Sequence, residues 1–309
     1  SIHCMAFRGE PTDPPITGNA FEFWGTNLTF PILGNISTCN VPGDVCDATA
    51  TSVWQETRDA AENAYDRSAQ CGFTSFVGYE YTGSSGGFNG HRNVIFRNEH
   101  VPDFPTSSFE TGGTNPPALW QALQTTCIDG VPGCEVLTIP HNSNMAGGEA
   151  FPDPQTVEEA ATRALFEPLV EIAQIKGGSE CRFDRLVGTG AGTTDEQCAW
   201  EQRPQAMQSD VPPAVFMPEI DDYPLRNMLR NVLKSGLEVE QRLGVNPFKF
   251  GFIGSTDNHN GTPGAVEEDE LNGNHGGEDD TPVERIHKIW DNPGSLAVLW
   301  AEENSRDAL

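Results

Sequence analysis

Short apolar runs that end in metal-type ligands constrain this chain more than any other sequence feature. The run FTSFVGYE ends at Glu80, EVLTIPHN carries His141, and FKFGFIGSTDNH ends in Asp257 and His259. Near-continuous apolar runs of this length are typical of parallel strands that are buried on both faces. Because ligand sites of parallel sheets gather at the carboxyl ends of the strands, we expect these side chains to meet at one edge.

The runs alternate with segments that have helical periodicity. The clearest helix covers residues 224–243, where the apolar residues form one stripe and Gly244 ends the helix. Ser52 with Gln55, and Thr156 with Glu159, have the spacing of capping boxes. Further helices are predicted over residues 52–68, 117–123, 156–166 and 304–309, and strands over residues 73–80, 93–97, 135–140, 169–175, 248–254 and 296–300.

This alternation of strands and helices favours an α/β fold with parallel strands. No linker divides residues 1–309, so we predict a single domain. Residues 1–50 are rich in Pro, Gly, Asn and Thr and are expected to form an irregular, cysteine-containing segment. Residues 176–221 and 261–283 are expected to be loop excursions from the α/β core.

The charge of the chain narrows the classes of partner. The formal net charge is -27, with 45 acidic against 18 basic residues. Such a chain has no basic surface to displace counterions, which argues against a nucleic-acid partner, and it is not suited to anionic lipid. No apolar run approaches the roughly 20 residues of a membrane span, so no membrane insertion is expected. The oligomeric state stays open.

The cysteines indicate the compartment. The chain has eight, and three pairs flank turn-rich loops that contain glycine. Pairs of this kind are typical of disulfides in exported proteins, with ordinary buried thiols as the alternative. We predict a periplasmic or extracellular protein with the disulfides Cys39–Cys46, Cys127–Cys134 and Cys181–Cys198, which leaves Cys4 and Cys71 as a further pair.

The segment GSTDNH is the sharpest of the chemistry-bearing motifs. Asp257 and His259 are two residues apart just beyond an apolar strand. In an extended chain both side chains point to the same side, so that one metal ion could be held through oxygen and nitrogen. The alternative is a turn in which Asp257 caps the backbone.

Three further residues are candidate ligands at neighbouring strands. Glu80 ends an apolar strand, where an unpaired buried carboxylate would be costly and would need a partner or a metal. His141 follows Pro140 at a strand end, and His91 follows a glycine-rich loop. The alternatives are a glutamate at the surface and histidines that are bonded to the backbone in the core.

Other polar residues nearby are suited to an anionic substrate. The guanidinium of Arg92 presents a fork that matches phosphate, sulfate or carboxylate, with a surface ion pair as the alternative. Lys176 follows a strand end and is a second candidate for anion binding, and Asn142 is a lesser one. For Glu171, inside an apolar strand, we favour a structural pair with a neighbouring strand.

Several of these segments together resemble the family called DUF3604, which looks like a branch of the PHP (polymerase and histidinol phosphatase) superfamily. The resemblance extends from about Trp54 onward and is carried by GYEYT, GHRNVIFRN, TIPHNSN, EPLVEIAQIKG, LGVNPFKFGFIGSTDNHNGTPG and NPGSLAVLWAEENSRDAL. It implies a distorted (β/α)7 barrel, here incomplete at both ends. It also implies hydrolysis of phosphoesters with zinc, manganese or iron at the carboxyl rim of the strands.

The resemblance assigns ligand roles residue by residue. Glu80 matches the strand-end glutamate that bridges metals, His91 and His141 match the histidines of the next two strands, and Asp257 and His259 match the terminal Asp-x-His. The superfamily's opening His-x-His and its second motif, a Thr-Asp-His-like strand end, have no counterpart in this chain. Five ligands are expected to hold one or two divalent ions.

The residues and the resemblance lead to one expected function and one rival. We expect an exported metal-dependent hydrolase that acts on a small phosphoester or related anionic ester. Arg92 and Lys176 are its candidate catalytic residues, and Arg92 and Asn142 are its candidate substrate-binding residues. The rival is a non-catalytic structural or binding module on a PHP-like barrel with a depleted metal site. Because the opening SIHCMAFRGEP is unlike a translation start, we expect the chain to be part of a longer protein.

Overall fold

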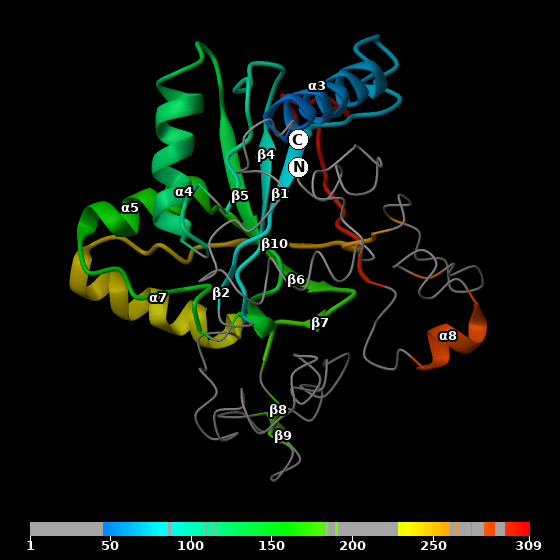
Figure 1. Cartoon of the computed structure of the whole chain (residues 1–309). Coiled ribbons are helices and arrows are strands. Elements are labelled where there is room, and N and C mark those ends of the chain that lie inside the picture. The colour runs from blue at the N-terminus through cyan, green and yellow to red at the C-terminus, as the bar shows by residue number, and fades with distance from the viewer. Residues whose placement is uncertain are drawn as a thin grey trace. The chain divides into compact units, whose positions relative to one another are not determined.

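The chain divides into two compact units, and each is assembled from stretches that are separate in the sequence. The computed structural model describes residues 46–85, 88–108, 110–113, 115–146, 148–181, 183–184, 189–190, 228–259, 264, 273, 281–287 and 294–309. The first unit comprises Ser1–Gly87, Asn93–Leu137 and Trp300–Leu309, and the second comprises Phe88–Arg92 and Thr138–Leu299. The strands β4 (Arg92–Phe96) and β5 (Val136–Pro140), labelled in Figure 1, therefore contribute residues to both units.

A three-stranded sheet and two helices organise the first unit. The sheet has the order β1 (Val77–Tyr81), β4, β5, and the helix α3 (Cys46–Ala64) precedes it in the chain. The helix α4 (Pro116–Leu123) begins at Asn115, whose side chain accepts a hydrogen bond from the backbone of Ala118. It continues into a π-helical turn over Gln124–Ile128. Between β1 and β4 in the sequence, β2 (Ser84–Ser85) and β3 (Phe88–Asn89) pair with each other in a separate two-stranded sheet.

An aromatic cluster joins α3 to the sheet inside the first unit. The ring of Trp54 lies edge-on to Tyr79 at 5.8 Å and 6.1 Å from Phe96, measured between ring centroids. Its indole nitrogen donates to the carbonyl of Pro102 at 2.9 Å, which satisfies the polar end of a buried side chain. The helix is therefore held to the sheet by large apolar contacts together with a directed hydrogen bond.

The C-terminal segment packs against the same helix and sheet. Arg306 is buried and forms an ion pair with Glu62 at 2.8 Å. Its Nε donates to the carbonyl of Ser75 at 2.7 Å, and its guanidinium lies 4.5 Å from the centre of the Tyr65 ring. A single arginine thus fixes the end of the described chain to α3 and to the segment before β1.

The sheet of the second unit has the order β10, β6, β7. β10 (Gly251–Gly254) runs parallel to β6 (Leu169–Gln174), whereas β7 (Gly177–Gly178) is antiparallel to it. The register aligns Ile253 with Glu171 and shifts between Ile253 and Gly254. Smaller elements are a 3-10 turn η3 (Ser143–Met145), the pair β8 (Phe183–Asp184) and β9 (Thr189–Gly190), and α8 (Pro282–His287).

Two helices flank this sheet in the sequence. α7 (Leu229–Leu243) ends at Gly244, whose φ of +79° is the left-handed conformation that terminates many helices. α5 (Val157–Phe166) begins at Thr156, whose hydroxyl accepts from the backbone of Glu159 at 3.1 Å. The core of the unit includes Leu229 and Val232 of α7 and Val170 of β6. Its full set of buried residues is Ala146, Ala150, Phe151, Val170, Leu229, Val232, Phe248 and Phe250.

Most predicted elements are confirmed, with three corrections. The helix from Thr156 to Phe166 and the strands at β4, β5, β6 and β10 are present at or close to their predicted positions. The cap at Ser52 is wrong, because α3 begins six residues earlier at Cys46. The strand over residues 296–300 and the helix over 304–309 are also wrong. Side chains from Leu296 to Trp300 are mostly exposed, and Trp300 is 97% exposed.

The mixed α/β fold class is confirmed. Among the described residues, the strands form two three-stranded and two two-stranded sheets and do not close into a barrel. The (β/α)7 barrel stays a prediction. Within the same residues, no helix combines the length and apolar character needed to cross a membrane.

The cysteine predictions have different outcomes. The Cys127–Cys134 disulfide is confirmed, with Cα atoms 5.3 Å apart. Cys181 is also in a disulfide, and its predicted partner Cys198 lies outside the described residues, as do Cys4 and Cys39. The Cys4–Cys71 pair is wrong, because Cys71 carries a free thiol. Cys71 lies in a turn after α3 with a φ of +46°, where its thiol contacts the carbonyl of Ser68 at 3.4 Å.

Candidate metal centre

Two buried histidines lie next to each other at strand ends in the second unit. His91 directly precedes β4 and His141 directly follows β5. Their ring centroids are 5.8 Å apart and the rings are inclined at 72°. Their segments are joined, because the His91 N–H donates to Oδ1 of Asn142 at 3.2 Å. The segment of His141 is also bound to β6, because Nε2 of Gln174 donates to the carbonyl of His141 at 2.8 Å.

Asp257 and His259 follow β10 in a segment without regular secondary structure. Asp257 has a φ of +48°, a left-handed conformation that Asp tolerates better than most residues, so the extended geometry expected for this motif is wrong. Oδ2 of Asp257 lies 2.5 Å from Nζ of Lys176, and both side chains are largely buried. Lys176 follows β6, so the parallel pairing of β6 with β10 brings this ion pair together.

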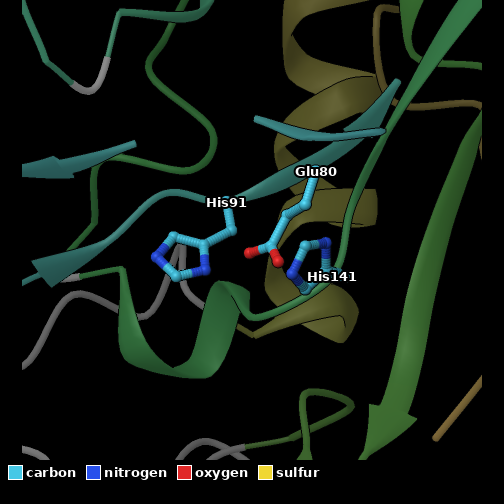
Figure 2. Close-up of side chains that lie close together, drawn as sticks. All are labelled: Glu80, His91 and His141. Carbon is cyan, nitrogen blue, oxygen red and sulfur yellow. The ribbon is translucent and has the colours of Figure 1, made fainter. Parts of the chain in front are cut away.

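The candidate ligands fall into two groups that share one carboxylate. Ligand atoms of Glu80, His91 and His141 lie within 4.8 Å of one another, and so do those of Glu80, Asp257 and His259. Figure 2 draws the first group and shows the Glu80 carboxylate pointing toward the two imidazole rings. All five residues predicted as metal ligands therefore occur in one group or the other.

Glu80 differs from its prediction in one respect. The sequence suggests a buried carboxylate, whereas Glu80 is exposed. Val77 and Tyr81 are the buried residues of β1, and Glu80 lies on the other face of the strand. Glu80 is therefore a candidate metal ligand because it lies beside the other ligands, and not because its burial would be costly.

The donor atoms fit a divalent metal ion. Imidazole nitrogen with carboxylate oxygen is a common ligand combination for zinc and is also suited to iron and manganese. Ligand atoms about 2.0–2.2 Å from a tetrahedral ion are about 3.3–3.6 Å from one another. The ligand atoms of each group lie within 4.8 Å of one another, so side-chain rotations that bring them closer would be needed for coordination.

Glu171 is a buried carboxyl next to these ligands. It accepts a hydrogen bond from the hydroxyl of Ser255, which follows β10, so the predicted pairing with a neighbouring strand is confirmed. Its other oxygen, Oε1, has no hydrogen-bond partner among the described residues. Burial raises the pKa of Glu171 to about 7, and the charge of Asp257 adds to this. His141, Ser255 and Lys176 act in the opposite direction.

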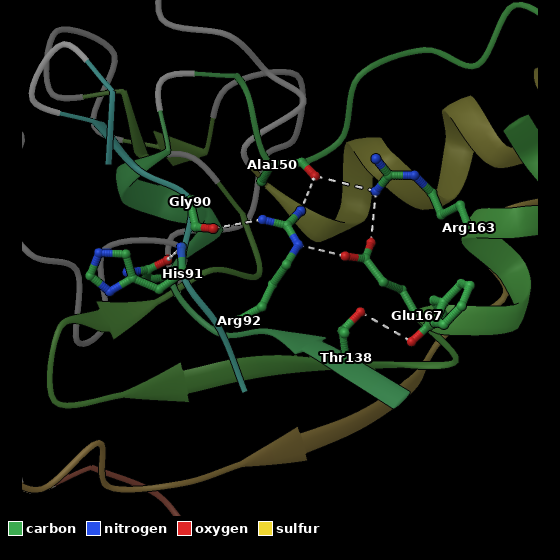
Figure 3. A network of polar contacts seen from close by, with 9 residues as sticks. Gly90, His91, Arg92, Thr138, Ala150, Arg163 and Glu167 are labelled. Carbon is green, nitrogen blue, oxygen red and sulfur yellow. Dashed lines mark hydrogen bonds and ion pairs between the residues drawn. The ribbon is translucent and has the colours of Figure 1, made fainter. Parts of the chain in front are cut away.

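Arg92 has contacts that the sequence does not suggest. Its side chain is fully buried and forms an ion pair with Glu167 at 2.6 Å, at the end of α5. Its two other nitrogens donate to the carbonyls of Gly90 at 2.7 Å and Ala150 at 2.9 Å (Figure 3). These contacts favour a structural role, and substrate binding by Arg92 stays a prediction.

Lys176, a predicted catalytic residue, and Asn142, a predicted substrate-binding residue, are close to the ligands. Lys176 contacts Asp257, as described above. Asn142 is buried, its Oδ1 accepts from His91, and its Nδ2 has no hydrogen-bond partner among the described residues. A buried amide nitrogen in this state is a donor that a ligand could satisfy.

Sequence reasoning missed Glu167 and Arg163, which complete the network around Arg92. Arg163 donates to Glu167 at 2.8 Å and to the carbonyl of Ala150 at 3.2 Å. Burial lowers the pKa of Arg163 to about 10, an effect that Glu167 opposes and Arg92 reinforces. The i,i+4 spacing of Arg163 and Glu167 was the one signal in the sequence, but this spacing is usually found at exposed helix faces.

The chain belongs to a family described as a protein of unknown function (DUF3604), whose family model matches residues 28–309. No curated protein and no solved structure matches the chain.

Proposed function

We propose that this DUF3604 member is a metal-dependent hydrolase of the PHP type that cleaves a phosphoester or a related anionic ester. The observation that carries the proposal is the shared position of Glu80 in two groups of metal-type ligands. Two groups joined by one carboxylate suit one ion or a pair of ions, and zinc, manganese and iron all match the donors. A distorted (β/α)7 barrel is part of this proposal.

Each group of residues has a distinct task. Glu80, His91 and His141 would hold one ion, and Glu80, Asp257 and His259 would hold a second ion where two are bound. A bound metal supplies an activated water and polarises the ester oxygen. Nδ2 of Asn142 is placed to donate to an oxygen of the substrate, because its carbonyl end is already held by His91. Lys176, which pairs with Asp257, would supply positive charge for the anion.

We further propose that the protein acts outside the cytoplasm. The Cys127–Cys134 disulfide supports this, because disulfides persist mainly in oxidising compartments. The acidic chain and the amide nitrogen of Asn142 are consistent with a small anionic substrate bound through metal and neutral donors, not through a basic surface.

Metal analysis together with an activity assay tests the proposal. The purified protein should retain zinc, manganese or iron and should hydrolyse chromogenic phosphoesters or sulfate esters after reconstitution. Asp257→Ala should remove most of this activity and lower the metal content while the protein stays folded. Asp103→Ala is the matched control, because Asp103 is an exposed aspartate of the first unit.

The outcomes separate the proposal from its rival. Full turnover by Asp257→Ala would show that the hydrolysis does not use this centre. A folded wild-type protein that binds none of the three metals and hydrolyses no ester would favour the non-catalytic module.

A further inference from the structure

Arg92 and Asn142 hold the two polar atoms of a single peptide group. The carbonyl of Gly90 accepts from Nη1 of Arg92 at 2.7 Å. The N–H of His91, on the other side of the same peptide bond, donates to Oδ1 of Asn142 at 3.2 Å. Because a peptide group is planar, fixing its C=O and its N–H fixes its orientation. The direction of the His91 side chain is set in turn by this orientation.

The side chain of Arg92 is itself held rigidly. Its side chain is 0% exposed, as is that of its ion-pair partner Glu167. Ala150 adds a carbonyl at 2.9 Å, so the guanidinium contacts three separate parts of the second unit. Figure 3 shows that these contacts surround the guanidinium and lead through Gly90 to His91.

We propose that Arg92 is a positioning residue that fixes His91 as a metal ligand through the Gly90–His91 peptide group. The inference rests on the proposed function for its metal and on the contacts above for its geometry. Outer-sphere partners of this kind commonly contribute about 10–100-fold to metal affinity. This positioning role differs from the expectation that the guanidinium binds substrate, and the experiment below distinguishes the two roles.

Arg163 provides a matched control within the same network. It contacts Glu167 at 2.8 Å and Ala150 at 3.2 Å, the same two acceptors that Arg92 uses. The contacts drawn for Arg163 in Figure 3 go to these two acceptors, whereas those of Arg92 also include Gly90. Loss of either arginine removes a buried charge from the same network, so both variants are expected to lose stability. Loss of Arg92 also releases the peptide group before His91.

The experiment compares Arg92→Met, Arg163→Met and the wild type, each confirmed as folded by circular dichroism. Zinc affinity is measured by competition with a chromogenic chelator, and hydrogen exchange of the His91 amide is measured in the metal-free proteins. Arg92→Met should weaken zinc binding by about 10–100-fold and accelerate exchange at His91. Arg163→Met should leave both quantities close to wild type despite its lower thermal stability.

Several outcomes would overturn the inference. Equal losses of zinc affinity in the two variants would show a general effect of stability. Unchanged zinc affinity in Arg92→Met with a raised KM for an ester would show that the guanidinium binds substrate. If Arg92→Met does not fold, Arg92→Lys takes its place, because a lysine can pair with Glu167 but cannot also reach both carbonyls. Wild-type zinc affinity in a folded Arg92→Lys would contradict the positioning role.

The amide measurement keeps this inference separate from the proposed function. If the wild type binds no zinc, the metal centre is wrong, yet faster exchange at His91 in the Arg92 variants alone would still establish the clamp on the peptide group. Unchanged exchange of the His91 amide in those variants would contradict the clamp on the peptide group, whether or not the protein binds zinc.

Discussion

At the scale of the residue, Lys176 is the counter-ion of a candidate metal ligand. Its ammonium lies 2.5 Å from Oδ2 of Asp257, a candidate ligand. A metal ion that binds Asp257 must displace this ammonium from the carboxylate. Lys176 and a metal ion would therefore compete for the carboxylate of Asp257.

We expect Lys176→Met to bind zinc more tightly than the wild type. An ion pair of this kind contributes about 1 kcal/mol, and its loss corresponds to roughly a fivefold gain in metal affinity. Chelator competition measures the change. Lys249→Met is the control, because it removes an exposed pair with Glu240. Weaker zinc binding by Lys176→Met would mean that the lysine supports the ligands and does not compete with the metal.

Glu62 gives a prediction on pH dependence. Burial acts to raise the pKa of Glu62, but hydrogen bonds and charge from Arg306 and Arg67 outweigh it, so the net pKa is lowered. A carboxyl whose folded pKa is depressed contributes stability above its unfolded pKa, and this contribution is lost as the pH falls through the folded value. The relevant window lies below the ordinary value of 4.5.

Glu62→Gln should therefore be less stable than the wild type at about pH 7, and the difference should shrink toward about pH 3. Urea unfolding at a series of pH values measures it. Glu135→Gln is a comparison variant, because Glu135 pairs with Arg97 at an exposed position. A difference that stays constant across the pH range would show that the charge of Glu62 is not responsible.

The residues that sequence reasoning placed at the correct position are those that follow a strand. His141 follows β5 and Asp257 follows β10, as their apolar runs predict, and their roles as ligands stay predictions. The partner of Arg92 could not be predicted, because Glu167 is 75 residues away and a buried arginine pair leaves no periodic pattern. The local conformation of Asp257 could not be predicted either, because a left-handed residue other than glycine depends on its tertiary contacts.

At the scale of the element, Gly236 shows tertiary packing overriding helix propensity. Gly236 lies within α7, where glycine costs about 1 kcal/mol relative to alanine. A Cβ at this position would overlap the side chain of Asn246. Oδ1 of Asn246 accepts from the backbone of Phe248 at 2.9 Å, and Phe248 belongs to the core of the second unit.

We expect Gly236→Ala to destabilise the protein in spite of the better helix former. Displacing the buried Asn246 loses a hydrogen bond and disturbs Phe248, at a cost of about 2–3 kcal/mol against a gain of about 1. Urea unfolding gives the net change. The double variant Gly236→Ala with Asn246→Ala should lose less stability than the two single changes added together, because the overlap is absent from it. A Gly236→Ala variant that is more stable than the wild type would contradict this packing.

Elements could be predicted where their own residues determine them. Thr156 and Glu159 place the start of α5, and Gly244 places the end of α7. The strand over residues 296–300 was predicted from apolar, β-favouring residues, but a strand also needs a neighbour to pair with. In the described part of the chain, Ser295 donates to the carbonyl of Ser255, and residues 296–300 extend beyond it without a strand partner.

At the scale of the whole molecule, the formal net charge of -27 opposes folding through self-repulsion. We expect the urea midpoint to rise as sodium chloride increases from about 10 mM to about 150 mM, over which the Debye length falls from about 30 Å to about 8 Å. Glucose at matched osmolality is the control. A midpoint that falls over this range would show that attractive ion pairs such as Arg306 with Glu62 outweigh the repulsion.

The interleaved units have a consequence for dissecting the protein. Each unit is assembled from separate stretches of chain, and β4 and β5 are cut by the boundary between them. No single cleavage, truncation or expression boundary can isolate either unit with its strands intact. A fragment ending after Leu137 would lack the C-terminal arginine anchor of the first unit, and one starting at Thr138 would lack His91.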